Sequence, residues 1–347
     1  MRRWSLLAIG AAALILAAGV NEVDAAKKLK LGTVANPGIP LGAAIAEGLV
    51  PVTEKVSGGE LIIEPHYRGS ICGEQICGEQ SAQGLIAVAT SSTANFGNFG
   101  ATYAAFDLPY LFKDLDIANE LAKGWFGKAH HDRAVAETGF HVFSVFSAGG
   151  FRQVANTKHT VRVPKDLKGI KIRVTKSPVE FTLIKSWGGV PIPYDWLQLY
   201  QGLQTGVVEG QYVQIAWQEL FKMYEVQPYF TFTNGAWGGN VLYVHDINMK
   251  KLTDEEKAWL REGMDAFDTL AREKDSAWIE TGIKVMATKE GVEYYHPTPA
   301  EMDLWRAGAV VAWKDAKGTY DAKIVEKALM EQGLTAFLDT LKKGGAL

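Results

Sequence analysis

The 347-residue chain has only two cysteines and almost no excess of either charge. Its net charge of −3 gives the molecule no overall positive footprint for nucleic acid. Beyond residue 25 no segment is apolar enough to span a bilayer. The sequence also lacks the HExxH, GxSxG, Walker and GxGxxG motifs. We therefore expect no nucleic-acid partner, no enzyme activity, no metal site and no cofactor.

The one long apolar run lies at the start of the chain. Arg2 and Arg3 precede an apolar segment at residues 6–20, and Val23-Asp24-Ala25 places small residues at the −3 and −1 positions of a cleavage site. This pattern is typical of a secretory signal peptide, residues 1–25, that is cleaved after Ala25. An uncleaved anchor helix is the alternative. We expect an exported, soluble mature protein.

The two cysteines, Cys72 and Cys77, lie in a tandem ICGEQ-ICGEQ. In an oxidising compartment a pair this close in sequence can form a disulfide, although the bridge closes a small loop and requires a distorted first helical turn. A metal site is the alternative, but no histidine cluster lies nearby. We favour a structural disulfide.

Strand-like and helix-like segments alternate in the first half of the chain. Strands are expected at residues 29–34, 60–66 and 85–90, and helices at 41–56, interrupted by Pro51, and at 74–84. This order predicts parallel strands with helices on both faces, and such sheets bind ligands at the carboxyl ends of their strands. Those ends lead into Asn36, residues 67–69 and Ser91-Ser92-Thr93, which suit a ligand wall or ordinary loops.

The alternation continues in the second half. We expect strands at residues 140–146, 152–156, 170–174 and 207–211 and helices at 117–124, 127–138, 178–187 and 195–205. A capping box at residues 253–256 begins a helix that reaches about residue 288, and residues 301–347 are helical. A helix of that length spans about 50 Å, more than one small domain. The sequence predicts an α/β protein with two lobes, a cleft between them and a long helix along both.

One stretch, residues 149–174, is rich in basic side chains: GGFRQVANTKHTVRVPKDLKGIKIRV. Arg152 and Arg173 each lie in a short apolar run that is typical of a strand, and alternation places Arg173 opposite the apolar face of its strand. A guanidinium presents a planar fork of N–H donors that matches a carboxylate. We expect these two arginines to hold a small organic anion. Four lysines are expected on the solvated surface: Lys158, Lys165, Lys168 and Lys176.

Two of the ten tryptophans could cover such an anion. Trp196 follows an extended proline-rich segment, and Trp237 lies in an expected glycine-rich loop at residues 234–239. Packing in the core is the alternative for each of them.

At this point the motifs resemble a known family. The stretch at 149–174 and the block GGVPIPYDWLQLYQGLQTGVVEGQ at 188–211 look like the signature blocks of the solute-binding proteins of TRAP transporters (tripartite ATP-independent periplasmic; the dicarboxylate-receptor-like, DctP-type family). The segment FDLPYLF at 106–112 and the long helix are also similar to that family. The resemblance covers nearly the whole mature chain.

The resemblance implies a periplasmic receptor that closes on a small organic acid and delivers it to the small and large membrane subunits of a permease. It implies lobe I at residues 26–149 and 239–278, and lobe II at 150–238 and 279–347. The family's anchoring arginine falls on Arg173, its supporting arginine on Arg152, and its pocket aromatic near Trp196.

The sequence departs from the family at one position, because the family's polar anchor, usually asparagine, falls on Val213. Tyr212 or Gln214 is expected to supply the missing contact. A receptor for a sulfonate or an aromatic acid, and a periplasmic enzyme or sensor on the same scaffold, are the alternatives.

Overall fold

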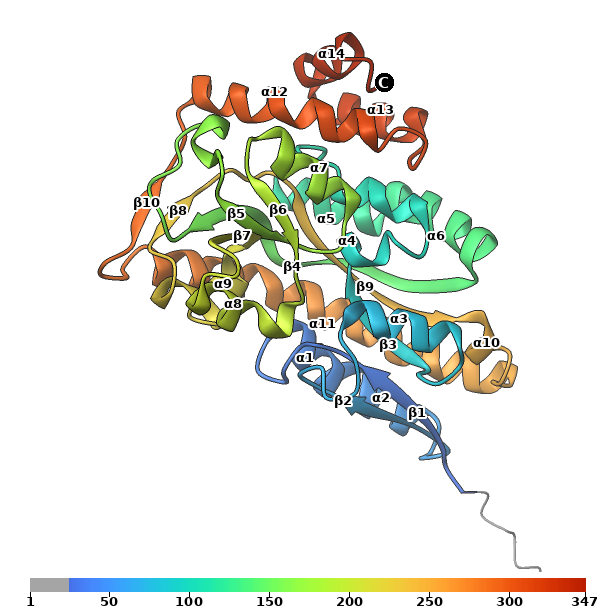
Figure 1. The fold of residues 1–347 in the computed structure, drawn as a ribbon. Coiled ribbons are helices and arrows are strands. Elements are labelled where there is room, and N and C mark those ends of the chain that lie inside the picture. Colours follow the sequence, from blue (N-terminus) through green and yellow to red (C-terminus); the bar gives the residue numbers. More distant parts are fainter. Residues whose placement is uncertain (1–24) are drawn as a thin grey trace, which may run out of the picture.

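The computed structural model describes residues 25–347, and Figure 1 shows their arrangement. The expected signal peptide, residues 1–25, therefore lies outside the described residues except for Ala25. Within the described residues no helix is both long and apolar enough to cross a membrane.

The strands form two half-sheets that share the long strand β4. In space the strand order is β2-β1-β3-β9-β4-β7-β5-β6, with β8 lying between β4 and β10. The strands are β1 (Lys27–Gly32), β2 (Leu61–His66), β3 (Val88–Ser92), β4 (Phe140–Asn156), β5 (Lys171–Val174), β6 (Val190–Pro193), β7 (Gly210–Gln214), β8 (Tyr229–Thr231), β9 (Trp237–His245) and β10 (Glu293–Tyr295).

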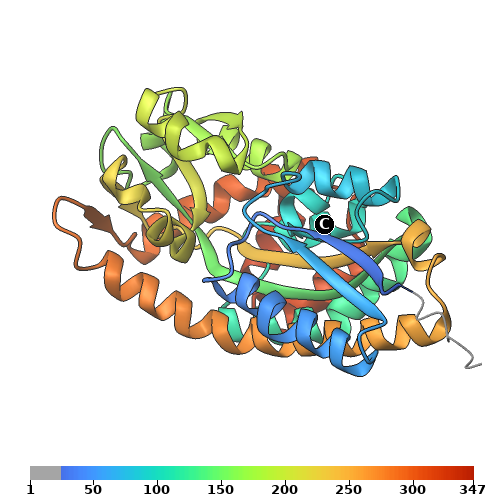
Figure 2. The same ribbon diagram turned by 90° about the horizontal axis from the view of Figure 1, so that it is seen from below.

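Helices cover the faces and ends of these half-sheets (Figures 1 and 2). The α-helices are α1 (Pro40–Ala44), α2 (Val50–Val56), α3 (Glu74–Ala82), α4 (Thr93–Phe96), α5 (Leu115–Lys123), α6 (Trp125–Thr138), α7 (Pro178–Ser186), α8 (Leu199–Thr205), α9 (Ile215–Leu220), α10 (Asp246–Met249), α11 (Asp254–Met286), α12 (Pro299–Asp315), α13 (Ala322–Glu331) and α14 (Thr335–Lys343). The two-lobed α/β architecture expected from the sequence is confirmed, whereas the exact lobe boundaries stay predictions.

The first half-sheet follows the predicted parallel pattern. Strand β1 pairs in parallel with both β2 and β3. The helix expected to be interrupted by Pro51 is divided into α1 and α2 by a π-helical turn, η1 (Ile45–Leu49). This wider turn directly precedes Pro51, which has no N–H to donate and whose ring would clash with the Glu47 carbonyl in a regular helix.

The prediction of two separate strands at residues 140–146 and 152–156 is wrong, because β4 runs through both. It bends at Gly149 and Gly150, whose φ angles are +91° and +84°, and its register shifts between Ser147 and Phe151. A Cβ on Gly149 would lie 2.8 Å from Cδ1 of Trp217. Glycine is therefore required at a bend that lets one strand serve both half-sheets.

Two further expectations about strands need correction. Trp237 does not lie in a loop: it begins β9, and its ring packs against Phe106 and Phe112 in the core. The glycines after it were misleading, because they leave room within a strand for the ring of Trp237 and the side chain of Gln214. The strand expected at 207–211 is β7, three residues later along the chain. The helix expected at 195–205 begins as a 3₁₀ turn, η4 (Trp196–Gln198), and continues as α8.

Helix α11 joins the two lobes (Figure 2). It begins with the predicted capping box between Thr253 and Glu256, and its 33 residues correspond to about 50 Å. It packs on α1, η1 and α2 at one end and on β4 and α9 further along. Two glycines allow its closest approaches, Gly263 beside Thr53 and Gly282 beside Ala216.

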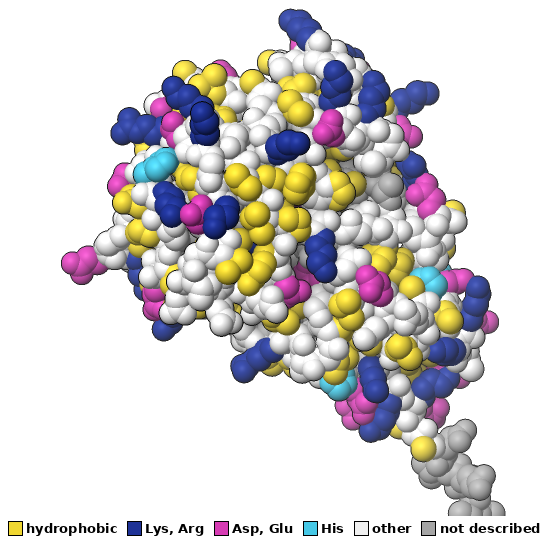
Figure 3. All heavy atoms as spheres, viewed as in Figure 1, with side chains coloured by type: hydrophobic (Ala, Val, Ile, Leu, Met, Phe, Trp, Pro, Cys, Tyr) yellow, Lys and Arg dark blue, Asp and Glu magenta, His cyan; other side chains and the backbone are white. Residues whose placement is uncertain are grey.

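The remaining predicted elements are also present. Residues 301–347 form α12, α13 and α14, with Trp305 and Trp313 of α12 fully buried. Cys72 and Cys77 form a disulfide directly before and within α3, with their Cα atoms 5.2 Å apart. Figure 3 shows basic and acidic side chains interspersed on one face, without a continuous patch of one sign.

We expect Gly263→Ala to lower the free energy of unfolding by about 1–3 kcal/mol, as overpacking does elsewhere. The new Cβ would lie 2.0 Å from Oγ1 of Thr53 and 3.0 Å from the carbonyl oxygen of Leu49. Because Thr53 Oγ1 has no hydrogen-bond partner among the described residues, adding Thr53→Ala should restore much of the loss. Urea unfolding of the single and double variants measures this. If the double variant lost as much unfolding free energy as the two single variants together, the predicted clash between residue 263 and Thr53 would be wrong.

Candidate ligand-binding site

A cavity with about 380 Å³ of empty space, partly open to solvent, lies between the two half-sheets. One wall comes from the first half-sheet and its helices, through Val34, Glu74, Ser92 and Asn240. The opposite wall comes from the second half-sheet and its connections, through Arg152, Arg173, Thr175, Trp196, Val213, Gln214 and Trp217.

Arg173 is held on the central strand of the second half-sheet, where β5 lies between β6 and β7. Its side chain is 3% exposed, its Nε donates to the carbonyl oxygen of Tyr194 at 2.9 Å, and its guanidinium lies 5.7 Å from the ring centre of Trp196. It makes no ion pair with any described residue. Burial lowers its pKa to about 10, so the group stays positively charged at neutral pH.

Arg152 is equally buried but is already neutralised. Its Nε lies 2.9 Å from Oε1 of Glu180, and its Nη1 donates to the carbonyl oxygen of Tyr212 at 3.3 Å. Burial alone would lower the pKa of Arg152, but the carboxyl groups of Glu180 and Asp107 outweigh it and raise this pKa. The two arginines are therefore electrostatically different, although both line the cavity.

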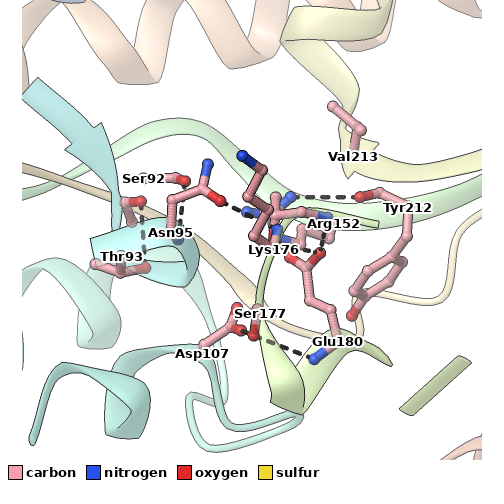
Figure 4. A network of polar contacts seen from close by, with 12 residues as sticks. Ser92, Thr93, Asn95, Asp107, Arg152, Lys176, Ser177, Glu180, Tyr212 and Val213 are labelled. Carbon is pink, nitrogen blue, oxygen red and sulfur yellow. Dashed lines mark hydrogen bonds and ion pairs between the residues drawn. The ribbon is translucent and has the colours of Figure 1, made fainter. Parts of the chain in front are cut away.

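Glu180 is itself fixed by hydrogen bonds (Figure 4). Its Oε2 accepts from the backbone N–H and the hydroxyl of Thr175, both at 2.8 Å, and its backbone N–H donates to Oγ of Ser177 at 3.2 Å. Ser177 also donates to the carboxyl of Asp107. Burial, and then the negative charge of Glu180, raise the pKa of Asp107 to about 8, so Asp107 keeps its proton at neutral pH.

The first half-sheet contributes a carboxylate to the cavity. Glu74 lies in the first turn of α3, and its Oε2 accepts hydrogen bonds from Oγ of Ser92, at 2.8 Å, and from Nδ2 of Asn95. Its Oε1 accepts none from the described residues.

The two walls also touch beside the cavity. The backbone N–H of Lys176 donates to Oδ1 of Asn95 at 3.1 Å, and Nδ2 of Asn98 donates to the carbonyl oxygen of Lys176 at 3.0 Å (Figure 4). These bonds connect α4 and the residues after it with the segment between β5 and α7.

The structure brings four of the sequence-predicted residues together at the cavity: Arg152, Arg173, Trp196 and Gln214. It places the other four elsewhere. The ring of Tyr212 packs edge-on against Trp187, and Trp237 lies in the aromatic core. Oδ1 of Asn36 accepts from the N–H of Gly38 at 2.8 Å, and Ser91 is fully buried within β3.

The four lysines expected on the surface are exposed, which confirms that part of the sequence interpretation. Val213 lines the cavity as an apolar side chain at the position where the family usually has asparagine.

Sequence reasoning missed several cavity residues: Glu74, Thr175, Trp217 and Asn240. Ser92, at the end of β3, belongs to the segment expected as a possible ligand wall, but the sequence singled out Ser91 instead of Ser92. Glu180 carried a signal in the pattern Ser177-Pro178-Val179-Glu180, but that pattern predicts a helix cap rather than a site. Glu74 and Asn240 carried no local signal.

Known proteins resemble this chain over most of its length. The family model of the bacterial extracellular solute-binding proteins, family 7 (DctP), matches residues 31–319. A solute-binding protein from Chromohalobacter salexigens is 26% identical over 313 residues, which cover 90% of this chain and 86% of that protein. The C4-dicarboxylate-binding periplasmic protein DctP of Rhodobacter capsulatus is 28% identical over 305 residues, covering 86% and 88%.

Solved structures share the fold. A TRAP periplasmic solute-binding protein from Shewanella oneidensis with bound succinate superposes with a TM-score of 0.83 at 20% identity, covering 89% of this chain and all of that one. The sugar-acid-binding protein DctPAm from Advenella mimigardefordensis, in complex with galactonate, gives 0.81 at 24% identity, covering 92% and 99%. With a two-lobed fold, a cavity between the lobes and a family match over most of its length, the chain belongs to family 7 of the bacterial extracellular solute-binding proteins, the solute receptors of TRAP transporters.

Proposed function

We propose that this chain is a periplasmic receptor that captures a small organic acid on Arg173 and delivers it to the small and large membrane subunits of a TRAP permease. The observation that carries the proposal is the state of Arg173. It is buried, it faces the cavity, and no described residue forms an ion pair with it. A buried unpaired cation is costly, and a ligand carboxylate removes that cost.

The geometry supports a two-point contact with a carboxylate. Nε of Arg173 is engaged by Tyr194, which fixes the plane of the guanidinium and leaves its other N–H groups for a ligand. Trp196 lies under the same group and offers an apolar surface to the ligand body. Exclusion of water on closure lowers the local dielectric constant and strengthens the ion pair. The ligand stabilises the closed form only by its extra affinity for that form.

Acids recur among the molecules that relatives and structural neighbours are described as binding. They include a C4-dicarboxylate, 2,3-diketo-L-gulonate, sialic acid, succinate and galactonate. A site built around an arginine fork suits this class. No nucleophile, base and orienting group converge at the cavity among the described residues, so we propose capture without chemical conversion.

A thermal-shift screen over hydroxy, keto, aromatic and sulfonic acids tests the proposal. A captured acid should raise the melting temperature by linkage, and it should be recovered unchanged after incubation. No shift with any acid would overturn the proposed function, and a chemically altered acid would contradict capture without conversion.

We expect Arg173→Ala to weaken acid binding by about 30-fold to several thousand-fold, because removal of one partner of a buried charge pair costs roughly 2–5 kcal/mol. Arg173→Lys should not restore the affinity, since an ammonium cannot reproduce the planar fork. Calorimetry with an acid from the screen measures both losses. Arg162→Lys is the matched control, because Arg162 is an exposed arginine of the same basic stretch. If Arg173→Ala bound the acid as tightly as the wild type, the assignment of Arg173 as the anchor would be wrong.

The raised pKa of Asp107 predicts that the free energy of unfolding depends on pH. Its pKa of about 8 in the folded chain lies above the value of 3.8 for an unperturbed aspartate, so the folded state holds an extra proton between about pH 4 and pH 8. This group therefore makes the ligand-free protein less stable as pH rises through that window, by up to about 1.4 kcal/mol per pH unit. In Asp107→Asn this part of the slope should vanish. Urea unfolding at a series of pH values compares the two proteins, and identical slopes would refute the prediction.

A further inference from the structure

The charged groups that line the cavity, taken together with the ion-pair partner of Arg152, sum to zero before any ligand binds. Arg152 and Arg173 contribute two positive charges, and Glu180, paired with Arg152, contributes one negative charge. Glu74 contributes the second negative charge, from the opposite wall. At the adjoining rim, Lys176 and Asp195 also carry opposite charges. Asp107, behind the second wall, keeps its proton at neutral pH.

Glu74 is fixed in a position from which it can meet a ligand. Ser92 and Asn95 both donate to its Oε2, and neither donates to its Oε1. Glu74 lines both the main cavity and the adjoining rim, together with Arg173 in each case. The two side chains nevertheless form no ion pair, so the cation and the carboxylate remain separate. The charge of Glu74 still reaches both arginines: it helps to raise the pKa of Arg152, and it opposes part of the lowering that burial causes in the pKa of Arg173.

This arrangement has opposite effects on the two ends of a ligand. A carboxylate on Arg173 neutralises a buried cation, but a second carboxylate against Glu74 would bring two like charges together in a poorly solvated space. A hydroxyl or ammonium group at the same place would instead donate a hydrogen bond to the carboxylate. Of these, an ammonium group also keeps the sum of charges at zero once the acid is bound.

We propose that Glu74 is a specificity-determining residue, and that the ligand has one carboxylate for Arg173 and an O–H or N–H donor, not a second carboxylate, for Glu74. This inference rests on the proposed function, since it takes acid capture by Arg173 as given. It narrows the ligand class to hydroxylated or amino monoacids and excludes unsubstituted dicarboxylates.

The wild-type protein tests the inference without any substitution. Three series of straight-chain acids, matched in length, carry a hydroxyl, an ammonium or a second carboxylate at the far end. At the chain length that binds best, we expect the hydroxyl or ammonium acid to bind at least about tenfold more tightly than the dicarboxylate. The comparison between hydroxyl and ammonium acids distinguishes the two kinds of donor. A dicarboxylate that binds as tightly as its partners would overturn the inference.

Glu74→Gln tests the residue directly, because the amide keeps the size of the side chain and can still accept from Ser92. We expect the variant to bind dicarboxylates at least about tenfold more tightly than the wild type and to lose affinity for the ammonium acids. Glu79→Gln is the matched control, since Glu79 is an exposed glutamate on the same helix and should leave both affinities unchanged. If Glu74→Gln kept the wild-type preference between dicarboxylates and ammonium acids, Glu74 would not be a specificity-determining residue.

These outcomes separate the inference from the proposed function. If no acid of any series or of the wider screen binds, the proposed function fails. If acids bind and Arg173→Ala abolishes their binding, but Glu74→Gln has no effect on the preference, only the inference about Glu74 fails.

Discussion

The binding site depends on the ion pair between Arg152 and Glu180. Both side chains are almost fully buried, so each requires the other to offset the loss of hydration. Because Glu180 is also held by Thr175, it cannot turn toward Arg173 without giving up two hydrogen bonds. The pair therefore engages Arg152 and leaves Arg173 without an ion pair among the described residues. This difference underlies the roles we propose, Arg152 as a support and Arg173 as the anchor for an acid.

The difference between the two arginines depends on residues in strands rather than in loops. Arg152 lies on β4 and Arg173 on β5, and β7 pairs with both strands. The two arginines therefore belong to one half-sheet, with Glu180 beside them on α7. The opposite wall belongs to the other half-sheet and its helix, with Ser92 on β3 and Glu74 on α3. The bend of β4 at Gly149 and Gly150 and the long helix α11 are the connections through which the walls keep their relative position.

The sequence alone was sufficient for most of the elements and for singling out Arg173 as the candidate anchor. Alternation within a short strand set Arg173 apart from the lysines around it, and the resemblance assigned its role. The sequence was insufficient wherever a residue's environment comes from distant segments. The strand expected at 207–211 ended before Tyr212, so the alternation of side chains along β7 was not available to separate Tyr212 from the cavity-lining Val213. The sequence predicted a loop at Trp237 because Gly238 and Gly239 are typical of loops, although both lie in the buried strand β9.

Glu74 illustrates the same limit. Nothing near it in the sequence distinguishes it from Glu79, which occupies the same place in the second copy of the ICGEQ repeat. Only the fold places one copy at the cavity and the other on the surface.

The disulfide beside Glu74 has a consequence for the maturation of the receptor. Its two sulfur atoms cover Gly32 of β1 so closely that a Cβ there would lie 2.8 Å from each of them. The bridge thus packs the start of α3 against the end of β1, two residues from the Glu74 carboxylate that lines the cavity. Arg152 and Arg173 lie on the second half-sheet, away from this disulfide. We therefore expect the proposed discrimination by Glu74 to depend on the oxidation of Cys72 and Cys77, and the proposed anchoring by Arg173 not to depend on it.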